Sequence, residues 1–310
     1  MIEPPPPIVV GDAADVHVEE VVVQLRRGGS DPVVLDAASL SSGTLSLYGD
    51  RLDVAGAQVR QPARGWIRRL APHGWRSTMA SDSHEGARRA AWVVALTSWL
   101  ETARVEWLSP FAELIASESR HRQLKSAHRL GIPVPRTVIG NDLDRVAEEL
   151  GRHVICKPLG PAVFVDEGGE VLHVPATLVD LAEINPLAAS GAPFVFQERI
   201  SARVHVRVVV VNDRTWTCQL DATSLPVDWR ESDLAHASFE VCDDREAAKS
   251  TLRLCRALGV RTASADWIDS SDGRLVFLDL NPGGQWLFLP EPVAGDVTVA
   301  LASWLLEARV

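Results

Sequence analysis

Two apolar stretches near the C-terminus flank an Asp-Gly pair, and acidic residues interrupt both of them. The stretches span residues 265–268 and 277–281, with Asp272-Gly273 between them. An Asp-Gly pair between apolar stretches is a strong signal for an antiparallel hairpin. Because side chains alternate along a strand, Asp279 and Asn281 share one face, and counting back through the turn places Asp266 approximately opposite them.

This arrangement predicts a magnesium site on the hairpin. Two carboxylates and an amide oxygen are hard ligands, and such ligands suit Mg²⁺ that bridges phosphates. Acids are depleted in strands, yet these acids stand between Trp, Phe and Leu. The alternative is an ordinary hairpin whose acids are solvated on its wet face. We expect Asp266, Asp279 and Asn281 to be Mg²⁺ ligands.

Two further strand ends carry polar residues. Lys157 follows the apolar residues Val154-Ile155-Cys156, where its ammonium can point into a cleft and neutralise phosphate charge. Strand-terminal lysines also commonly extend to water, so the position alone is a weak signal. The apolar stretch Phe194–Phe196 reaches Gln197 and Glu198 and can serve as a hinge whose backbone meets an adenine edge.

The pattern of apolar residues divides the 310 residues into α/β units. We expect an N-terminal α/β domain over residues 1–108, a central lobe over 109–196 and a strand-rich C-terminal lobe over 197–310. Asp166-Glu167-Gly168-Gly169 predicts a turn between two strands of the central lobe. Helices are predicted over residues 18–25, 85–102, 120–130, 142–150, 244–258 and 296–309. This order fits neither a TIM barrel nor a single Rossmann sheet.

Composition excludes several classes of function. The formal net charge of -10 argues against a nucleic-acid partner, which needs a cationic face. The most apolar helical stretch, residues 90–100, is far shorter than the roughly 20 residues that span a bilayer. The four cysteines are scattered, without the spacing of a zinc site or a disulfide framework, and the N-terminus lacks a signal-peptide pattern. We expect a soluble cytoplasmic protein with no membrane partner.

The order of these motifs along the chain resembles the order of motifs in ATP-grasp enzymes. It runs from Gly131-Ile-Pro-Val-Pro-Arg-Thr137 through Lys157-Pro158, residues 196–198, Arg207 and Asp266 to the segment 278–282. The ending Asn281–Trp286 and the earlier Asp228-Trp229-Arg230 narrow the match. The chain is similar to the graspetide (microviridin-type) peptide maturases over nearly its whole length. This family cyclises ribosomal precursor peptides through side-chain esters or amides.

The resemblance implies a fold, two cofactors and a role for each matching residue. The fold is α/β with α+β lobes, an ATP-grasp fold preceded by an N-terminal pre-ATP-grasp α/β domain. The cofactors are ATP and Mg²⁺, the partner is a leader-core precursor peptide, and the assembly is a homodimer. Arg207 and Arg230 would face the substrate carboxylate and the acyl phosphate. The implied nucleotide-binding residues are Arg120, Lys157, Gln197, Glu198 and Ile200.

The chain departs from the family pattern at several positions. Arg120 stands where relatives have a nucleotide-binding lysine, and Asp279 stands where they usually have a glutamate at the metal. Both changes keep the charge and are compatible with ATP chemistry. Ala202 and His205 stand where relatives tend to have a lysine and an acid before the residue that matches Arg207. Because of these two changes, the resemblance does not identify the substrate.

The implied reaction has two steps, and other functions compete with it. A substrate carboxylate attacks the γ-phosphate, and a hydroxyl or an amine then captures the acyl phosphate. A ligase of small amino acids or of a carrier-bound metabolite is one alternative, and it would turn over ATP without a peptide. A catalytically silent ATP-binding module is another, and it would bind ATP without hydrolysis.

Overall fold

A computed structural model describes the chain over most of its length. The described residues are 5–36, 44–49, 51–54, 57–59, 64–69, 83–160, 163–165, 171–185 and 191–307. The predicted turn at residues 166–169 lies outside these ranges. Within them, no helix combines the length and the apolarity that crossing a membrane requires.

The N-terminal lobe is built on a parallel sheet with strand order β2-β1-β6-β7. Its central strand β1 (Ile8–Val10) is wholly buried, as expected for a strand with neighbours on both sides. Helix α1 (Val16–Arg27) begins where the Asp15 side chain accepts a hydrogen bond from the backbone N–H of His17. The other elements of this lobe are β2 (Val33–Leu35), β6 (Arg64–Ile67), β7 (Glu106–Trp107), α4 (His84–Thr102) and a meander of β3 (Leu45–Tyr48), β4 (Arg51–Val54) and β5 (Ala57–Val59).

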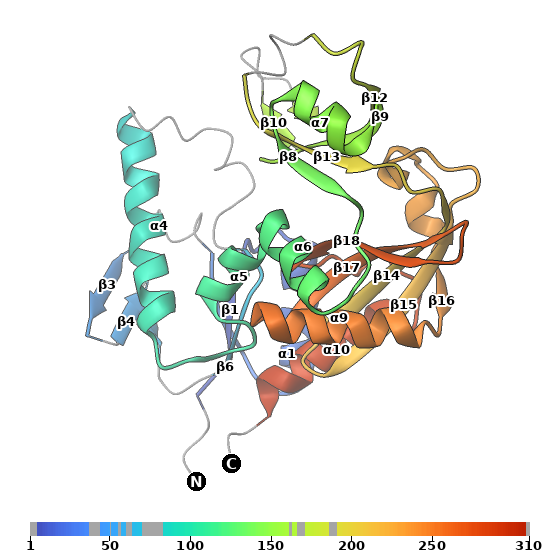
Figure 1. The fold of residues 1–310 in the computed structure, drawn as a ribbon. Coiled ribbons are helices and arrows are strands. Elements are labelled where there is room, and N and C mark those ends of the chain that lie inside the picture. The colour runs from blue at the N-terminus through green and yellow to red at the C-terminus, as the bar shows by residue number, and fades with distance from the viewer. Residues whose placement is uncertain are drawn as a thin grey trace.

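The central lobe is a small antiparallel sheet covered by one helix. The strand order is β12-β9-β13-β8, and α7 (Leu143–Leu150) packs on β8 and β13. Figure 1 shows this lobe standing above the rest of the molecule. Its strands are β8 (Thr137–Gly140), β9 (His153–Pro158), β12 (Thr177–Asp180) and β13 (Phe194–Glu198), with a separate pair of β10 (Val163–Val165) and β11 (Val171–His173).

The C-terminal lobe is a five-stranded antiparallel sheet of order β16-β15-β14-β17-β18. The central strand β14 (Ala202–Val211) has an almost continuous run of valines, because helices or loops cover both of its faces. Helix α9 (Arg245–Leu258) ends at Gly259, whose φ of 77° is left-handed and therefore suits glycine. The remaining elements are β15 (Arg214–Asp221), β16 (Glu240–Cys242), β17 (Thr262–Ser270), β18 (Leu275–Asn281), α10 (Val293–Leu306) and the short helices η1 (Trp229–Glu231) and η2 (Ala235–Ser238).

Two helices join the lobes and bring the strand ends together. Helices α5 (Phe111–Ser117) and α6 (Arg120–Arg129) pack against α9, and α6 also packs against β18. Helix α10 packs along α1, so the end of the C-terminal lobe lies on the N-terminal lobe (Figure 1). The interior of the central lobe is a separate cluster formed by Val146, Leu150, Val154, Leu181 and Phe196.

Candidate active site

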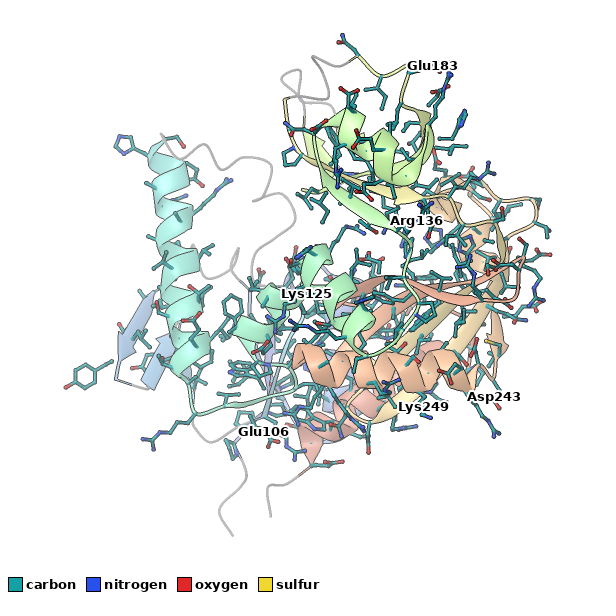
Figure 2. The ribbon with its side chains drawn as sticks, viewed as in Figure 1. Glu106, Lys125, Arg136, Glu183, Asp243 and Lys249 are labelled. Atoms are coloured by element: carbon teal, nitrogen blue, oxygen red, sulfur yellow. The ribbon has the colours of Figure 1, made fainter. Side chains whose placement is uncertain are left out.

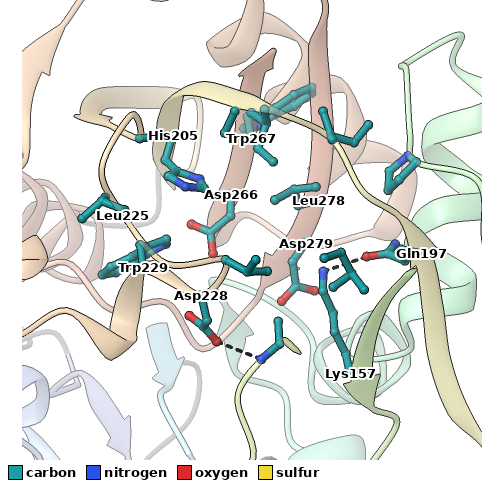
Figure 3. A pocket seen from close by; sticks show the side chains of 18 of the residues that line it. Lys157, Gln197, His205, Leu225, Asp228, Trp229, Asp266, Trp267, Leu278 and Asp279 are labelled. Carbon is teal, nitrogen blue, oxygen red and sulfur yellow. Dashed lines mark hydrogen bonds between the residues drawn. The ribbon is translucent and has the colours of Figure 1, made fainter. Parts of the chain in front are cut away.

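A cavity of about 430 Å³ lies between the central lobe and the C-terminal sheet. Strands β9 and β13 form one wall, and β14, β17, β18 and η1 form the other (Figure 3). Its lining includes most of the residues that the sequence predicts for the site: Arg120, Lys157, Gln197, Glu198, Ile200, Arg207, Arg230, Asp266 and Asp279.

The two candidate metal-binding aspartates lie directly opposite each other. Asp266 of β17 pairs with Asp279 of β18 in the antiparallel register, and a bulge follows at this point of the ladder. Directly opposed residues point to one face, so both carboxylates face the cavity. Asn281 pairs with Ser264 instead, and its side-chain oxygen accepts a hydrogen bond of 3.0 Å from the backbone N–H of Gly283. The structure therefore brings two of the three predicted ligands together in the cavity wall, and among the described residues the lining does not include Asn281.

Asp266 is held by two arginines. Arg207 donates to one carboxylate oxygen at 2.7 Å, and Arg230 donates to the other at 2.9 Å. Burial alone would raise the pKa of Asp266, but the charges of Arg207 and Arg230 outweigh burial and hold this pKa below its usual range. The carboxylate therefore stays ionised although it lies in the wall of a cavity.

Aromatic rings fix the planes of the two guanidinium groups. Arg207 lies over the ring of Phe288 at 5.2 Å, and Arg230 lies over the ring of Trp229 at 4.7 Å. Trp229 itself packs edge-on against Phe239, at 5.2 Å between ring centroids. These contacts, together with the burial of Arg207, restrict the rotation of the guanidinium groups and orient their donors toward Asp266, although the Arg230 side chain is partly exposed.

Lys157 is positioned from the opposite wall by its own sheet. Its ammonium donates to the Gln197 side-chain oxygen at 2.7 Å, and the Gln197 amide donates to the Thr137 hydroxyl at 3.0 Å. Burial, assisted by the charge of Arg120, lowers the pKa of Lys157 to about 8, although Asp279 acts in the other direction. An incompletely compensated ammonium in a cavity is suited to binding an anionic group such as phosphate.

The segment predicted to bind adenine, residues 197–200, lines the cavity, but two of its side chains form hydrogen bonds with other residues of the protein. Gln197 supports Lys157, while the Glu198 carboxylate accepts hydrogen bonds of 2.9 Å from the backbone and the guanidinium of Arg136. Ile200 lies in the lining beside them. Any recognition of a base edge here therefore falls to the backbone, while the aliphatic Ile200 side chain can only pack against a base.

Arg120 begins helix α6 and forms an ion pair with Asp279 at 3.3 Å. Helix α6 is tied to β18 by Gln123, whose side chain accepts from the backbone N–H of Leu280 at 3.0 Å and donates to its carbonyl at 2.7 Å. A buried amide that binds both backbone groups of one residue fixes the register of the helix against the strand. Arg120 and Asp279 are thereby held at a constant separation.

The donor set of Asp266 and Asp279 fits Mg²⁺. Magnesium is commonly held by one or two carboxylates together with substrate phosphates, so a third acidic residue is not required. Within the described ranges, no three His, Cys, Asp or Glu side chains gather into a metal cluster. Each Asp266 oxygen accepts one arginine hydrogen bond and keeps a further lone pair for a cation.

Three contributions to the site were not assigned from the sequence. Asp228 accepts from Arg230 and from the backbone N–H of Ala176, which belongs to the central lobe, both at 3.2 Å. The carbonyl of Gln285 accepts from Arg207 at 3.0 Å. His205 lines the cavity. The spacing Asp-x-Arg at residues 228–230 signals Asp228, whereas a backbone carbonyl carries no signal in a sequence.

Together, the antiparallel central sheet, the five-stranded sheet and the cavity between them define an ATP-grasp fold, and the predicted α/β fold class is confirmed.

Solved structures similar to this chain cover almost its full length. Macrocyclase MdnC bound with precursor peptide MdnA, from Microcystis aeruginosa MRC, matches with a TM-score of 0.80 at 19% identity, over 97% of this chain and 99% of that chain. A Chryseobacterium gregarium RiPP-associated ATP-grasp ligase, in complex with ADP and a leader and core peptide, matches with a TM-score of 0.82 at 18% identity, over 97% and 96%. ATP-grasp ligase PsnB complexed with minimal precursor, Mg and ADP matches with a TM-score of 0.73 at 23% identity, over 97% and 98%. No protein-family model matches the sequence, and no curated protein matches it.

Proposed function

We propose that this protein is an ATP- and Mg²⁺-dependent ligase that macrocyclises a ribosomal precursor peptide through side-chain ester or amide bonds. The observation that carries the proposal is one cavity containing Lys157, the opposed pair Asp266 and Asp279, and the arginines 207 and 230. The similarity to a macrocyclase and to ligases in complex with precursor peptides and ADP supports this substrate class.

In the first step, a substrate carboxylate attacks the γ-phosphate of ATP. Lys157 stabilises the charge that develops on the phosphate oxygens, and Arg120 contributes from the N-terminus of α6. Asp266 and Asp279 would hold Mg²⁺, whose chemistry here is the neutralisation of phosphate charge. The products are ADP and an acyl phosphate.

In the second step, a hydroxyl or an amine of the same peptide attacks the acyl carbon. Arg207 and Arg230 stabilise the oxyanion of the tetrahedral intermediate, since both face the cavity with preorganised donors. The central lobe covers the cavity and limits the access of water, which would otherwise hydrolyse the acyl phosphate. A cytoplasmic location, a homodimeric state and the absence of a nucleic-acid partner stay predictions.

The test is to incubate the protein, ATP and Mg²⁺ with precursor-like peptides encoded beside its gene. The expected result is ADP release together with the loss of one water per bond formed, measured by mass spectrometry. Ligation of free amino acids without any change in these peptides would favour a small-molecule ligase. ATP binding without turnover on any substrate would favour a silent module.

A further inference from the structure

His205 is an imidazole in the cavity wall with unused hydrogen-bonding capacity. The side chain is half-buried and lines the cavity near Leu225 and Trp229 (Figure 3). In the part of the chain that the structure describes, no hydrogen bond or ion pair joins its ring to another residue. A polar ring in a cavity wall without a protein partner is available to a ligand.

The backbone places His205 beside the groups assigned to acyl transfer. His205 and Arg207 are two residues apart on β14, so they point to the same face of the sheet. In the antiparallel ladder between β14 and β17, Arg207 lies opposite Asp266 and His205 lies opposite Ile268. A substrate group held by Arg207 therefore lies next to the imidazole, on the same face of the sheet.

The charges around His205 favour a neutral ring. Asp266 faces it from β17, Arg230 and Asp228 face it from η1 and the residue before it, and Arg207 is on its own strand. Burial, assisted by Arg230, keeps the pKa of His205 below its ordinary value although Asp266 and Asp228 act in the other direction. A neutral imidazole has one nitrogen lone pair that can accept a proton.

We propose that His205 is the general base of the second step and that its acceptor is a hydroxyl, so that the bond formed is an ester. This inference rests on the proposed function. The hydroxyl oxygen attacks the acyl carbon as its proton passes to the imidazole. The bond between the acyl carbon and the phosphate oxygen then breaks, and the leaving phosphate receives the proton from the imidazolium.

The chemistry of the two possible acceptors separates them. A hydroxyl is a weak nucleophile near neutral pH and needs a base during the attack. A lysine ammonium would enter a wall in which Arg207 and Arg230 already neutralise Asp266, and it would have to lose a proton before it could attack. A single neutral imidazole matches the single proton that a hydroxyl releases.

The experiment uses the precursor peptide that the wild-type protein processes, with hydroxylamine as a second nucleophile. Hydroxylamine captures an acyl phosphate without the help of a base, and the resulting hydroxamate reports the first step alone. We expect His205→Gln to keep the rate of hydroxamate formation within about threefold and to lower ester formation by about 100-fold or more. His128→Gln, a change on an exposed face of α6, is the matched control and should alter neither rate.

A rescue experiment distinguishes a base from a structural residue. Adding free imidazole to His205→Ala should restore ester formation without changing hydroxamate formation. Equal loss of both products without rescue, or unchanged ester formation in His205→Gln, would overturn the inference, as would a product joined by lysine amides. A wild-type protein that forms neither product with any neighbouring peptide would overturn the proposed function itself, and this inference with it.

Discussion

The charge of Asp266 depends on its neighbours rather than on solvent. Arg207 is 5% exposed and donates to Asp266, and its buried Nε atom has no hydrogen-bond partner among the residues that the structure describes. Removing one member of such a group leaves an uncompensated charge, so substitutions here can affect folding as well as chemistry. Tests of chemistry at these residues therefore need a parallel measurement of folding.

Asp279→Asn is expected to abolish ATP turnover while the protein remains folded. The side chain is partly exposed and keeps its size, so the change removes a charged oxygen ligand without opening a cavity. We expect turnover to fall by about 100-fold or more, beyond the effect typical of groups that only support a ligand. Asp272→Asn in the hairpin turn is the matched control, and it should leave ATP turnover unchanged. Wild-type turnover of Asp279→Asn at ordinary Mg²⁺ would remove this residue from the metal site.

Lys157→Met is expected to weaken ATP binding with little change in thermal stability, because it keeps an unbranched side chain of nearly the same length and removes the charge. Since the pKa of Lys157 is lowered to about 8, the free protein loses this proton as pH rises through 8. Phosphate prefers the protonated lysine, so affinity should be constant below pH 7 and fall by up to about tenfold per pH unit above 8.

Calorimetric titrations of wild type and Lys157→Met from pH 6.5 to 9.5 measure this dependence. The variant should lack the decline above pH 8. Lys249→Met, on helix α9 away from the central lobe (Figure 2), is the control. Unaltered affinity in Lys157→Met would assign Lys157 a structural role.

Arg207→Lys and Arg230→Lys should each depress product formation by roughly 100- to 1,000-fold, the range seen when an oxyanion donor is lost. The change keeps the charge but removes the planar fork and its stacking on Phe288 or Trp229. Single-turnover assays of ester or amide formation measure the loss. If both variants cyclise the peptide at the wild-type rate, the two arginines serve structure alone.

Strand alternation and a turn signal are sufficient to predict the opposed pair Asp266 and Asp279, which the ladder confirms. Strand alternation also predicted that Asn281 shares the face of Asp279, but the local hydrogen bond that its oxygen accepts from Gly283 was not predictable in this way. The support of Lys157 by Gln197 depends on the pairing of β9 with β13, strands nearly forty residues apart in sequence. Side-chain partners across strands follow from register, which a single sequence does not fix.

At the scale of elements, the loop after β18 connects the N-terminal lobe to the candidate active site. His17 accepts a hydrogen bond of 3.2 Å from the backbone N–H of Trp286, and its other nitrogen lies 3.1 Å from the Asp15 carboxylate. Arg68 donates to the carbonyl of Gly283. The same loop presents the Gln285 carbonyl to Arg207. The N-terminal lobe thus helps to position the loop whose Gln285 carbonyl accepts from Arg207.

His17→Leu is expected to lower kcat by roughly 10- to 100-fold with little change in the KM for ATP, because the loop loses the acceptor that fixes the Gln285 carbonyl. His17→Gln keeps an acceptor oxygen and should restore much of the rate. Steady-state kinetics of both variants, with circular dichroism as a check of folding, make the comparison. Equal rates in the two variants would show that the acceptor does not matter.

At the scale of the whole molecule, the hydrophobic cores do not coincide with three consecutive lobes. The N-terminal and C-terminal lobes share continuous hydrophobic clusters, whereas the central lobe has a cluster of its own. Amphipathic periodicity predicted nearly all the long helices, but α10 begins at Val293, before the predicted residue 296, and α5 was not predicted. Shared cores arise from contacts between distant segments, so the sequence pattern could not indicate them. The domain boundaries themselves stay predictions.

Because the central lobe has a core of its own, we expect it to move as a body relative to the remainder. Its described contacts with the C-terminal lobe include the hydrogen bond from the backbone of Ala176 to Asp228. A nucleotide that contacts Lys157 on one side and the pair Asp266 and Asp279 on the other would bridge the two lobes, and it would stabilise the closed arrangement by its binding free energy.

We therefore expect ATP with Mg²⁺ to slow amide hydrogen exchange in β9, β13, β17 and β18, which line the cavity, and to leave the packed pair α1 and α10 unchanged. Exchange followed by mass spectrometry, with and without nucleotide, measures the effect. Lys157→Met under the same conditions is the control, and its protection should be lost at equal ATP concentration. Protection confined to one wall would contradict a bridging nucleotide, because only a ligand that contacts both lobes slows exchange in both sheets together.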